Sequence, residues 1–208
     1  MPKDLHSWLN DLKARIPGEP LKVSREVQPS KFEVSAILHQ LEERGKLEAV
    51  LFEKVTSVKG EPTKFQLLCH AFTTHGKLAV SWGQKFSQRS TLFEHYLQIS
   101  KQRKPVTIVE ASAAPVKEVI IREASLDLAD LPIMRHNALD GGPYLTPVVV
   151  TQDPDKKRYN TSWNRMMYID SNHMAIYMSP RHLWTYFQKA ESRGEPLPIG
   201  VVLGNHMA

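Results

Sequence analysis

Cysteine is nearly absent from this 208-residue chain, in which Cys69 is the single example. One cysteine excludes an intramolecular disulfide framework and a cysteine-rich zinc site. A secretory signal is also missing from the N-terminus, and these absences together predict a cytoplasmic protein. The longest apolar runs, Pro147–Val150 and Ile199–Leu203, are far shorter than the roughly 18–20 residues that span a bilayer. The sequence therefore predicts no membrane span.

No charge of one sign dominates the sequence, because 27 Lys and Arg residues stand against 22 Asp and Glu residues, a net charge of +5. The basic residues are interleaved with glutamates, as in Gln40–Glu48. Without a basic stripe or a recognisable motif, the sequence predicts no nucleic-acid partner. Its 41% of hydrophobic and 24% of charged residues are close to the globular average, which excludes a disordered chain and predicts a packed core.

Apolar periodicity predicts an N-terminal α/β domain over residues 1–110. Helical spacing predicts helices over about 4–15, from Pro29-Ser30 to a cap at Gly45, and over about 91–101. Shorter β-rich runs predict strands at Leu21–Val27, Ala49–Val55 and Phe65–Phe72.

Proline and glycine punctuate the second part, residues 111–208, in which short β-rich runs follow one another. The predicted strands are Val106–Val109, at the junction with the first part, and then Val116–Ile121, Tyr144–Val150, Arg165–Tyr168 and Met174–Met178. One helix is predicted over about Arg181–Arg193, followed by a strand at Leu197–Leu203 that is apolar enough to be buried on both faces. Short strands between turns indicate a barrel or a strongly bent sheet.

Asp140–Pro147 is the first of three segments in this part that could carry chemistry. Its Gly141-Gly142 pair would let the backbone approach a ligand or adopt positive φ. An aspartate before two glycines and a proline is also typical of a tight turn into a strand. We favour the turn.

The second segment, Arg158–Met167, concentrates amide, hydroxyl and guanidinium groups, at Asn160, Thr161, Ser162, Asn164 and Arg165. Oxygen ligands and hydroxyl donors suit a phosphate with its divalent cation. An arginine can hold a carboxylate or a phosphate in a two-point fork. The alternative is a polar edge strand whose arginine meets a surface glutamate.

The third segment runs from Tyr177 to Leu183 and places Ser179-Pro180 at the predicted start of a helix. The free N–H groups of a helix N-terminus bind anions, and His182 in the first turn could reach a metal. The alternative, compatible with the first, is that Ser179 caps the helix and Pro180 occupies its first turn.

Taken in order, these segments resemble the UbiD family of reversible decarboxylases. The resemblance covers at least residues 120–205, and its motifs are Asp130-Leu-Pro-Ile, Asp140-Gly-Gly-Pro-Tyr, Asn160-Thr-Ser-Trp-Asn-Arg165, Ser179-Pro-Arg-His182 and Gly194–Gly204. It implies an α+β fold class, in which the N-terminal α/β domain precedes a split β-barrel of the flavin-reductase type that is incomplete at the C-terminus. It also implies prenylated FMN as cofactor, with a divalent metal, manganese above all, and a potassium ion.

The resemblance also assigns roles to individual residues. Asn160 and His182 would bind the metal, and Arg165 would be the catalytic residue beside the substrate carboxylate. The remaining cofactor-binding residues implied in this way are Trp163, Asn164, Tyr177, Met178, Ser179 and Leu183. If these assignments hold, the side chains of Asn160 and His182 should face one cleft.

The implied function is non-oxidative decarboxylation of an aromatic, heteroaromatic or α,β-unsaturated carboxylic acid, with a flavin prenyltransferase as the supplier of the cofactor. The family's metal-binding glutamate, its proton-handling acids and its oligomerisation domain have no counterpart before Ala208. We therefore expect a truncated or split enzyme that forms a homo-oligomer or joins a complementary C-terminal chain. The alternative is a catalytically inactive flavin- or phosphate-binding scaffold derived from the family.

Overall fold

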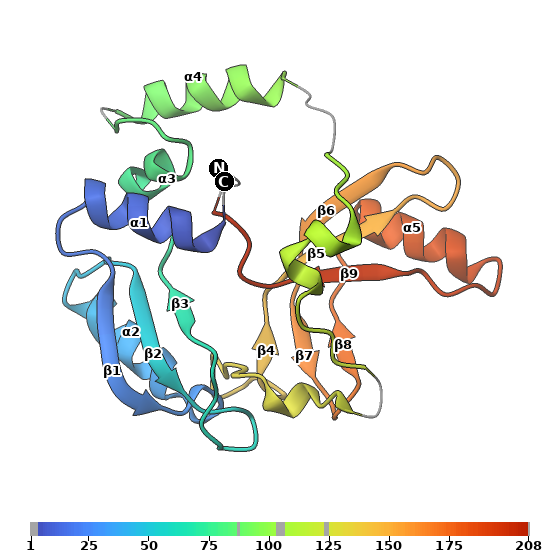
Figure 1. Cartoon of the computed structure of the whole chain (residues 1–208), viewed down its shortest axis with the longest axis horizontal. Coiled ribbons are helices and arrows are strands. Elements are labelled where there is room, and N and C mark those ends of the chain that lie inside the picture. Colours follow the sequence, from blue (N-terminus) through green and yellow to red (C-terminus); the bar gives the residue numbers. More distant parts are fainter. Residues whose placement is uncertain (1–3, 87, 103–106, 123–124, 208) are drawn as a thin grey trace.

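The computed structural model describes residues 4–86, 88–102, 107–122 and 125–207. It has mixed α/β architecture, as predicted, with two units side by side (Figure 1). The first unit runs from α1 to α4 and the second from β4 to β9. No helix among these residues is long and apolar enough to cross a membrane.

The first unit is built on a three-stranded sheet in the order β1-β2-β3. Its strands are β1 (Leu21–Val27), β2 (Val50–Val55) and β3 (Leu67–Cys69). β1 runs parallel to β2 and β2 runs antiparallel to β3. A parallel pair needs a crossover, which α2 (Glu33–Glu43) provides between β1 and β2.

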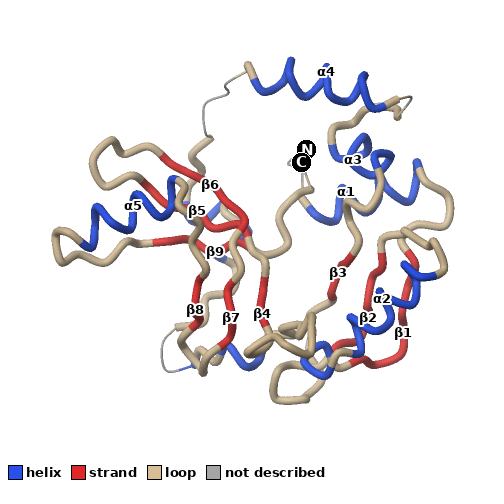
Figure 2. The backbone as a smooth tube through the Cα atoms, turned by 180° about the vertical axis from the view of Figure 1, so that it is seen from behind, coloured by secondary structure: helices blue, strands red, loops and turns tan. Residues whose placement is uncertain are grey.

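Two buried clusters hold the first unit together. Figure 2 shows α2 over one face of the sheet, where its Val34 packs with Val27, Val50 and Phe52. The second cluster contains Trp8 and Leu12 of α1 (Leu5–Arg15), with Val80 of α3 (His75–Ser81). The apolar stripe of each helix is therefore the face that the periodicity predicted. A further helix, α4 (Arg89–Ser100), follows α3.

The second unit contains two antiparallel sheets of three strands and one helix. The first sheet has the order β4 (Tyr144–Leu145), β7 (Met166–Tyr168) and β8 (Met174–Ile176). The second has the order β6 (Tyr159–Trp163), β5 (Val148–Gln152) and β9 (Ile199–Val202). The helix is α5 (His182–Glu191), whose Leu183 packs on Val149 and Met166. The described strands form no closed barrel.

Residues before β4 and after β9 tie the two units together. Lys59 of the first unit forms ion pairs of 2.7 Å with Asp127 and 2.6 Å with Asp130. Met134 belongs to the first unit's core, and Met207 packs against the cluster around Trp8. The segment between the units and the tail after β9 therefore both contact the first unit, and Figure 1 shows the tail running from β9 toward α1.

Several predicted elements differ from the observed ones. The described part of the predicted strand Val106–Val109, residues 107–109, is not a strand, and residue 106 lies outside the described residues. The predicted strand Val116–Ile121 is also wrong, because a 3-10 helix at Pro115–Lys117 occupies its start and no strand partner lies beside it among the described residues. The predicted strand Tyr144–Val150 is broken at Pro147 into β4 and β5, since proline has no N–H for a ladder. Burial of Leu197–Leu203 on both faces is also wrong: every residue of β9 is exposed, because it pairs only with β5 at the edge of the sheet.

Smaller deviations occur in the first unit. The strand predicted over Phe65–Phe72 is only three residues long. The second predicted helix begins as a 3-10 turn, Pro29–Lys31, and Phe32 adopts a left-handed conformation at φ 66° before α2 starts. Helix α3 was not predicted, although Thr74 caps it through its side chain, which accepts from the backbone N–H of Lys77.

Candidate functional site

Asn160 and His182 come from different elements and meet at one place. Asn160 lies on β6, where its side chain points to the same side as that of Ser162, because side chains alternate along a strand. His182 is the first residue of α5. Its Nδ1 lies 3.1 Å from Oδ1 of Asn160. The expected convergence of these two side chains is therefore observed, while their role as metal ligands stays a prediction.

The distance between these atoms fits two neighbouring ligands of one octahedral ion. Ligands that each lie about 2.1 Å from such an ion, at right angles to one another, are about 3.0 Å apart. Neutral imidazole and an amide oxygen both offer a lone pair. No three His, Cys, Asp or Glu side chains within the described ranges are arranged to hold a metal.

The N-terminus of α5 lies beside this pair and has no side-chain cap. Arg181 is the N-cap residue and its side chain makes no capping hydrogen bond. The prediction that Ser179 caps the helix is wrong, because Arg181 occupies the N-cap position. The backbone carbonyl of Ser179 accepts a hydrogen bond of 2.7 Å from the N–H of Arg181. Uncapped first-turn N–H groups attract anions. This end of α5 therefore suits a phosphate next to His182.

A chain of hydrogen bonds holds β6 against the residues that lead into α5. The Ser162 hydroxyl donates to Oδ1 of Asn164 over 2.8 Å, and Nδ2 of Asn164 donates to the Tyr177 carbonyl over 3.1 Å. The Tyr177 N–H in turn donates to the Arg165 carbonyl over 3.0 Å. The Asn164 amide is therefore engaged within the protein, where it sets the position of the strand end before His182. The motif alone did not indicate that Ser162 belongs to this chain of bonds.

The other end of α5 is fixed by an ion cluster. Lys189 lies 2.9 Å from the buried Asp153 and 3.0 Å from Asp155, which also pairs with Arg193. The hydrogen bond from Lys189 is the main reason why the pKa of Asp153 falls to about 2. Because both aspartates lie in the turn between β5 and β6, the cluster fixes α5 to the same hairpin that carries Asn160.

The other residues assigned by the resemblance lie at different depths. The Arg165 side chain is exposed and forms no ion pair with any described residue, so it is free to meet a ligand. Tyr177 is 69% exposed. Met178 and Leu183 pack together with Val149 in the second unit's core, behind the site. Their contact with a cofactor stays a prediction.

The Trp163 side chain does not lie beside Asn160 and His182. Three positions separate Trp163 from Asn160 on β6, so the two side chains point to opposite faces of the sheet. The indole is 62% exposed on its own face. The predicted cofactor contact of Trp163 therefore has no support from its side-chain position.

The Asp140-Gly-Gly segment forms a turn, in agreement with the interpretation that we favoured. Oδ2 of Asp140 accepts hydrogen bonds from the N–H groups of His136, at 3.2 Å, and Asn137, at 2.7 Å. A Cβ on Gly141 would lie 3.3 Å from the Met167 sulfur. Close packing of this turn on β7 thus accounts for the glycine without a ligand.

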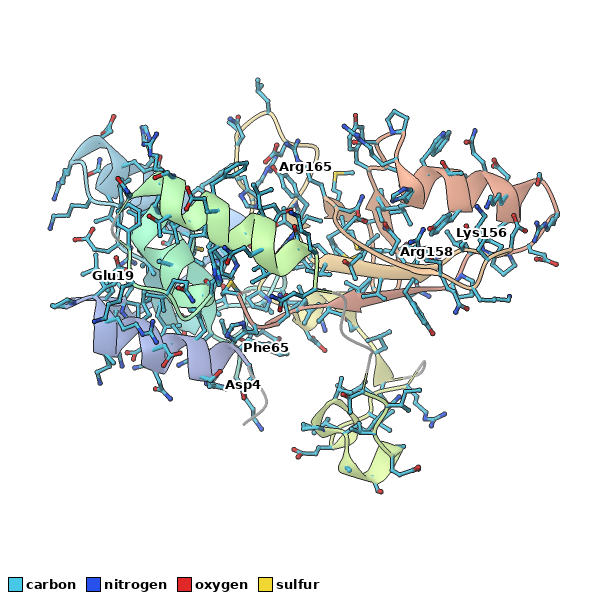
Figure 3. All side chains as sticks on the ribbon, turned by 90° about the horizontal axis from the view of Figure 1, so that it is seen from above. Asp4, Glu19, Phe65, Lys156, Arg158 and Arg165 are labelled. Atoms are coloured by element: carbon cyan, nitrogen blue, oxygen red, sulfur yellow. The ribbon has the colours of Figure 1, made fainter. Side chains whose placement is uncertain are left out.

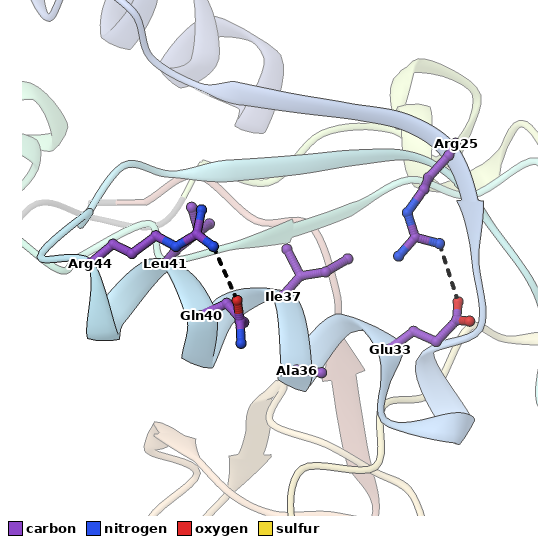
Figure 4. Close-up of a pocket in the computed structure, with 7 residues that line it drawn as sticks. All are labelled: Arg25, Glu33, Ala36, Ile37, Gln40, Leu41 and Arg44. Atoms are coloured by element: carbon purple, nitrogen blue, oxygen red, sulfur yellow. Dashed lines mark hydrogen bonds and ion pairs between the residues drawn. The ribbon is translucent and has the colours of Figure 1, made fainter.

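A groove of about 420 Å³ lies in the first unit, between β1 and α2 (Figure 4). Ile37 and Leu41 form part of its lining, and polar contacts lie at both ends. Arg25 and Glu33 are 3.9 Å apart at one end, and Arg44 donates to Gln40 over 3.4 Å at the other. The groove contains no imidazole or thiol and is on the other unit, so the chemistry of Asn160 and His182 is not located there.

Comparison with known proteins gives one consistent family. The UbiD family, described as 3-octaprenyl-4-hydroxybenzoate carboxy-lyase Rift-related domain, matches residues 107–208. An anhydromevalonate phosphate decarboxylase from Methanothermobacter thermautotrophicus is 49% identical over 84 residues, which are 40% of this chain and 20% of that protein. A phenolic acid decarboxylase from Sedimentibacter hydroxybenzoicus is 29% identical over 98% of this chain and 43% of its own length.

Solved structures with a similar fold belong to the same family. An evolved dimeric form of the UbiD-class enzyme HmfF from Pelotomaculum thermopropionicum, solved in complex with prFMN, superposes with a TM-score of 0.86 at 31% identity. The match covers 99% of this chain and 45% of that one. The chain thus spans less than half the length of these relatives.

Proposed function

Because this chain belongs to the UbiD family, whose members are carboxy-lyases, we propose that it forms the part of a non-oxidative decarboxylase that holds prenylated FMN and a divalent metal. The observation that carries the proposal is the 3.1 Å approach of His182 to Asn160 beside the uncapped start of α5. A flavin phosphate needs cations and helix N–H groups in one place, and this place offers both kinds of partner.

We propose separate roles for the residues near Asn160 and His182. Asn160 and His182 would hold a manganese ion, and the N–H groups of α5 would bind the flavin phosphate beside it. A potassium ion belongs to the same proposal. Ser162 and Asn164 keep β6 and the Tyr177–Ser179 segment in register. Prenylated FMN, when bound, supplies the electron sink for the pair of electrons left by carbon dioxide. The two sheets of the second unit are the first part of a split β-barrel.

Arg165 is the residue that we propose for the substrate. Its guanidinium is exposed next to the strand end that carries Tyr177, and it is free of competing ion pairs in the described part of the chain. A two-point fork suits the carboxylate of an aromatic, heteroaromatic or α,β-unsaturated acid. The role of this residue is to orient the carboxylate for departure as carbon dioxide.

The exposure of the site indicates what the chain needs for turnover. Tyr177 and Arg165 face solvent, and water weakens the charge interactions on which a buried active site depends. We propose that a complementary C-terminal polypeptide, or association between copies, covers this side and supplies the acid that returns a proton to the product. A flavin prenyltransferase would supply the cofactor.

The test is decarboxylation by the chain co-expressed with a flavin prenyltransferase and assayed with and without a UbiD-class C-terminal polypeptide. We expect Arg165→Ala to lower the rate of carbon dioxide release about ten- to a hundredfold, the value of a charge-assisted hydrogen bond, while flavin content per chain is retained. Arg165→Lys should recover only part of the rate. An equal loss of flavin content and of rate would mean that Arg165 binds the cofactor and not the substrate.

The second candidate function, a flavin-binding scaffold without turnover, is favoured by the same open site. It predicts a flavin spectrum in the purified protein and no carbon dioxide release under any of these conditions. The two functions are therefore separated by one assay in which absorbance and gas release are recorded together.

A further inference from the structure

We propose that Tyr186 is a positioning residue for His182. Its ring holds the imidazole in the rotamer that brings Nδ1 to Asn160, before a metal binds. This role rests on the proposed function, in which His182 is a metal ligand. Because His182 is exposed, an imidazole held by one hydrogen bond alone would still sample several rotamers. The contact with Tyr186 removes that freedom.

The contact between the two rings is set by their spacing along α5. Tyr186 follows His182 by four positions, which puts the two side chains on the same side of the helix. Their ring centroids are 6.2 Å apart and their planes differ by 18°, so the rings are stacked. Tyr186 is only 6% exposed. The exposed imidazole therefore lies against a buried ring.

Tyr186 is itself held by the ion cluster at the other end of α5. Nζ of Lys189 lies 5.7 Å from the centroid of the Tyr186 ring, within the range of a cation–π contact. The same ammonium donates to both carboxylate oxygens of Asp153, over 2.9 and 3.1 Å. The position of the tyrosine ring is therefore coupled to a buried carboxylate of the β5-β6 hairpin.

These contacts form a closed circuit through the hairpin. Asp153 follows directly after β5, which pairs with the part of β6 that carries Asn160. Figure 3 shows α5 running alongside this hairpin, near the label of Arg158. Asn160 in turn meets His182 at 3.1 Å. The hairpin that carries Asn160 thus also fixes, through Asp153 and Lys189, the ring on which the imidazole stacks.

The ring of Tyr186 is distinct from the hydrophobic core beneath α5. Leu183 belongs to the buried cluster around Val149, and Tyr186 does not. Both contacts of the tyrosine use its ring, and neither uses its hydroxyl. Phe187, the next residue, stacks on Trp184 instead, with ring centroids 5.7 Å apart. Phe187 is therefore a matched control for the loss of one aromatic ring from this helix.

A fixed imidazole favours metal binding because the ion binds ligand atoms at defined positions. Removing a group that orients a metal ligand typically weakens metal binding about ten- to a hundredfold. An imidazole that must first be ordered loses binding free energy to the entropy of ordering. We expect Tyr186→Leu, which removes the ring, to raise the Mn²⁺ dissociation constant about tenfold. Tyr186→Phe keeps the ring and should stay within about twofold of the wild-type value.

The experiment compares the purified wild-type chain with Tyr186→Phe, Tyr186→Leu and the control Phe187→Leu. Electron paramagnetic resonance measures the Mn²⁺ affinity, and three-bond NMR couplings measure the χ1 rotamer of His182 in the metal-free chain. We expect one rotamer in the wild type, in Tyr186→Phe and in Phe187→Leu, and averaged couplings in Tyr186→Leu alone. Urea titration compares the stability of the two leucine variants.

Lys189→Met tests the same contact from the other side of the circuit, and it keeps the test open if Tyr186→Leu fails to fold. Loss of the cation–π contact should weaken Mn²⁺ binding about two- to fivefold. Because Lys189 acts on His182 through Tyr186, the same substitution should have no further effect in the Tyr186→Leu background. Additive effects of the two substitutions would contradict the circuit.

The outcomes distinguish the role of Tyr186 from the proposed function. A wild-type chain that binds no Mn²⁺ would contradict the proposed metal site, and the rotamer of His182 in the metal-free chain would still decide the role of Tyr186. A single rotamer and an unchanged Mn²⁺ affinity in Tyr186→Leu would overturn that role while leaving the metal site intact. Equal changes in Phe187→Leu would overturn it too, since general packing of α5 would then be the cause.

Discussion

The two units of this molecule differ in how completely they bury their apolar side chains. In the first unit Trp8, Phe52 and Val50 are fully buried in two clusters that helices cover from both sides. In the second, one small cluster around Val149 lies between α5 and the sheet, while β9 and the face of the sheet away from α5 are exposed. Stability is thus concentrated in the first unit, and the groups suited to ligands and partners lie in the second.

Truncating the core of the first unit should have the largest effect. We expect Phe52→Ala to lower the free energy of unfolding by about 3–5 kcal/mol, because the cavity lies in a closed cluster that cannot collapse easily. Leu183→Ala in the second unit should cost about 2 kcal/mol, since its cluster borders open surface. Urea titration followed by circular dichroism measures both, and equal losses would contradict the contrast between the units.

Breaking the buried ion pair of the first unit should cause the next-largest loss of stability. Nζ of Lys77 lies 3.2 Å from Oε2 of Glu19, and Lys77 is fully buried on α3. Burial also lowers the pKa of Lys77, because the charged form is deprived of water. Glu19→Gln keeps an acceptor for the Ala49 N–H but removes the ion-pair partner of the ammonium, so that only the longer-range attraction of Glu48 remains. The expected loss is about 3 kcal/mol.

The control for this substitution is Glu26→Gln, which removes an exposed carboxylate from β1 of the same sheet. It should change the free energy of unfolding by no more than about 0.5 kcal/mol. Similar values for the two glutamine variants would mean that Lys77 is satisfied by the carbonyls of Leu47 and His70 and the hydroxyl of Thr73 alone.

The ion cluster of the second unit should give a smaller, pH-dependent effect. The pKa of Asp153 falls from its usual 3.8 to about 2 in the folded chain, so its contribution is fully present above pH 4 and is lost as the pH falls from about 4 to 2. Asp153→Asn should therefore lower the melting temperature at pH 7 and lose this difference in acid. An equal difference at both pH values would exclude the carboxylate charge as the cause. Asp11→Asn, on the exposed side of α1, controls for net charge.

The smallest expected effect is that of Ser162→Ala, which removes one hydrogen bond to Asn164. The cost should be about 1 kcal/mol of unfolding free energy. Because the Asn164 side chain is then held only by its bond to the Tyr177 carbonyl, we expect the affinity for FMN to fall further than stability alone would predict. Thr161→Ala, one position away on the opposite face of β6, should leave the FMN affinity as it is.

Sequence patterns predicted the secondary structure correctly where hydrophobic periodicity alone determines it. The apolar stripes predicted α1, α2 and α5 nearly to their ends. They failed for Val116–Ile121, because β-branched residues form a strand only when a partner strand is present. The burial of Leu197–Leu203 failed for a related reason, since apolar residues become buried only where another element covers them.

The sequence predicted which residues of the candidate site lie together, but not how each side chain is oriented. The motifs with Asn160 and His182 indicated a shared location, and the two atoms do lie within 3.1 Å. The orientation of Trp163 and the bond between Ser162 and Asn164 depend on which face of β6 each residue occupies. That register is set by the pairing of β5 with β6 and by α5 above it, which no local motif encodes.

The most direct test of the central claim is the coupling between manganese and FMN binding in the purified chain. If Asn160 and His182 hold a cation against the flavin phosphate, Mn²⁺ should raise FMN affinity at least about fivefold, and FMN should raise Mn²⁺ affinity by the same factor. Flavin fluorescence and electron paramagnetic resonance measure the two affinities. His182→Ala should abolish the coupling, whereas His173→Ala, in the turn between β7 and β8, should preserve it. FMN binding that is equally tight with and without Mn²⁺, or coupling that survives in His182→Ala, would contradict the account.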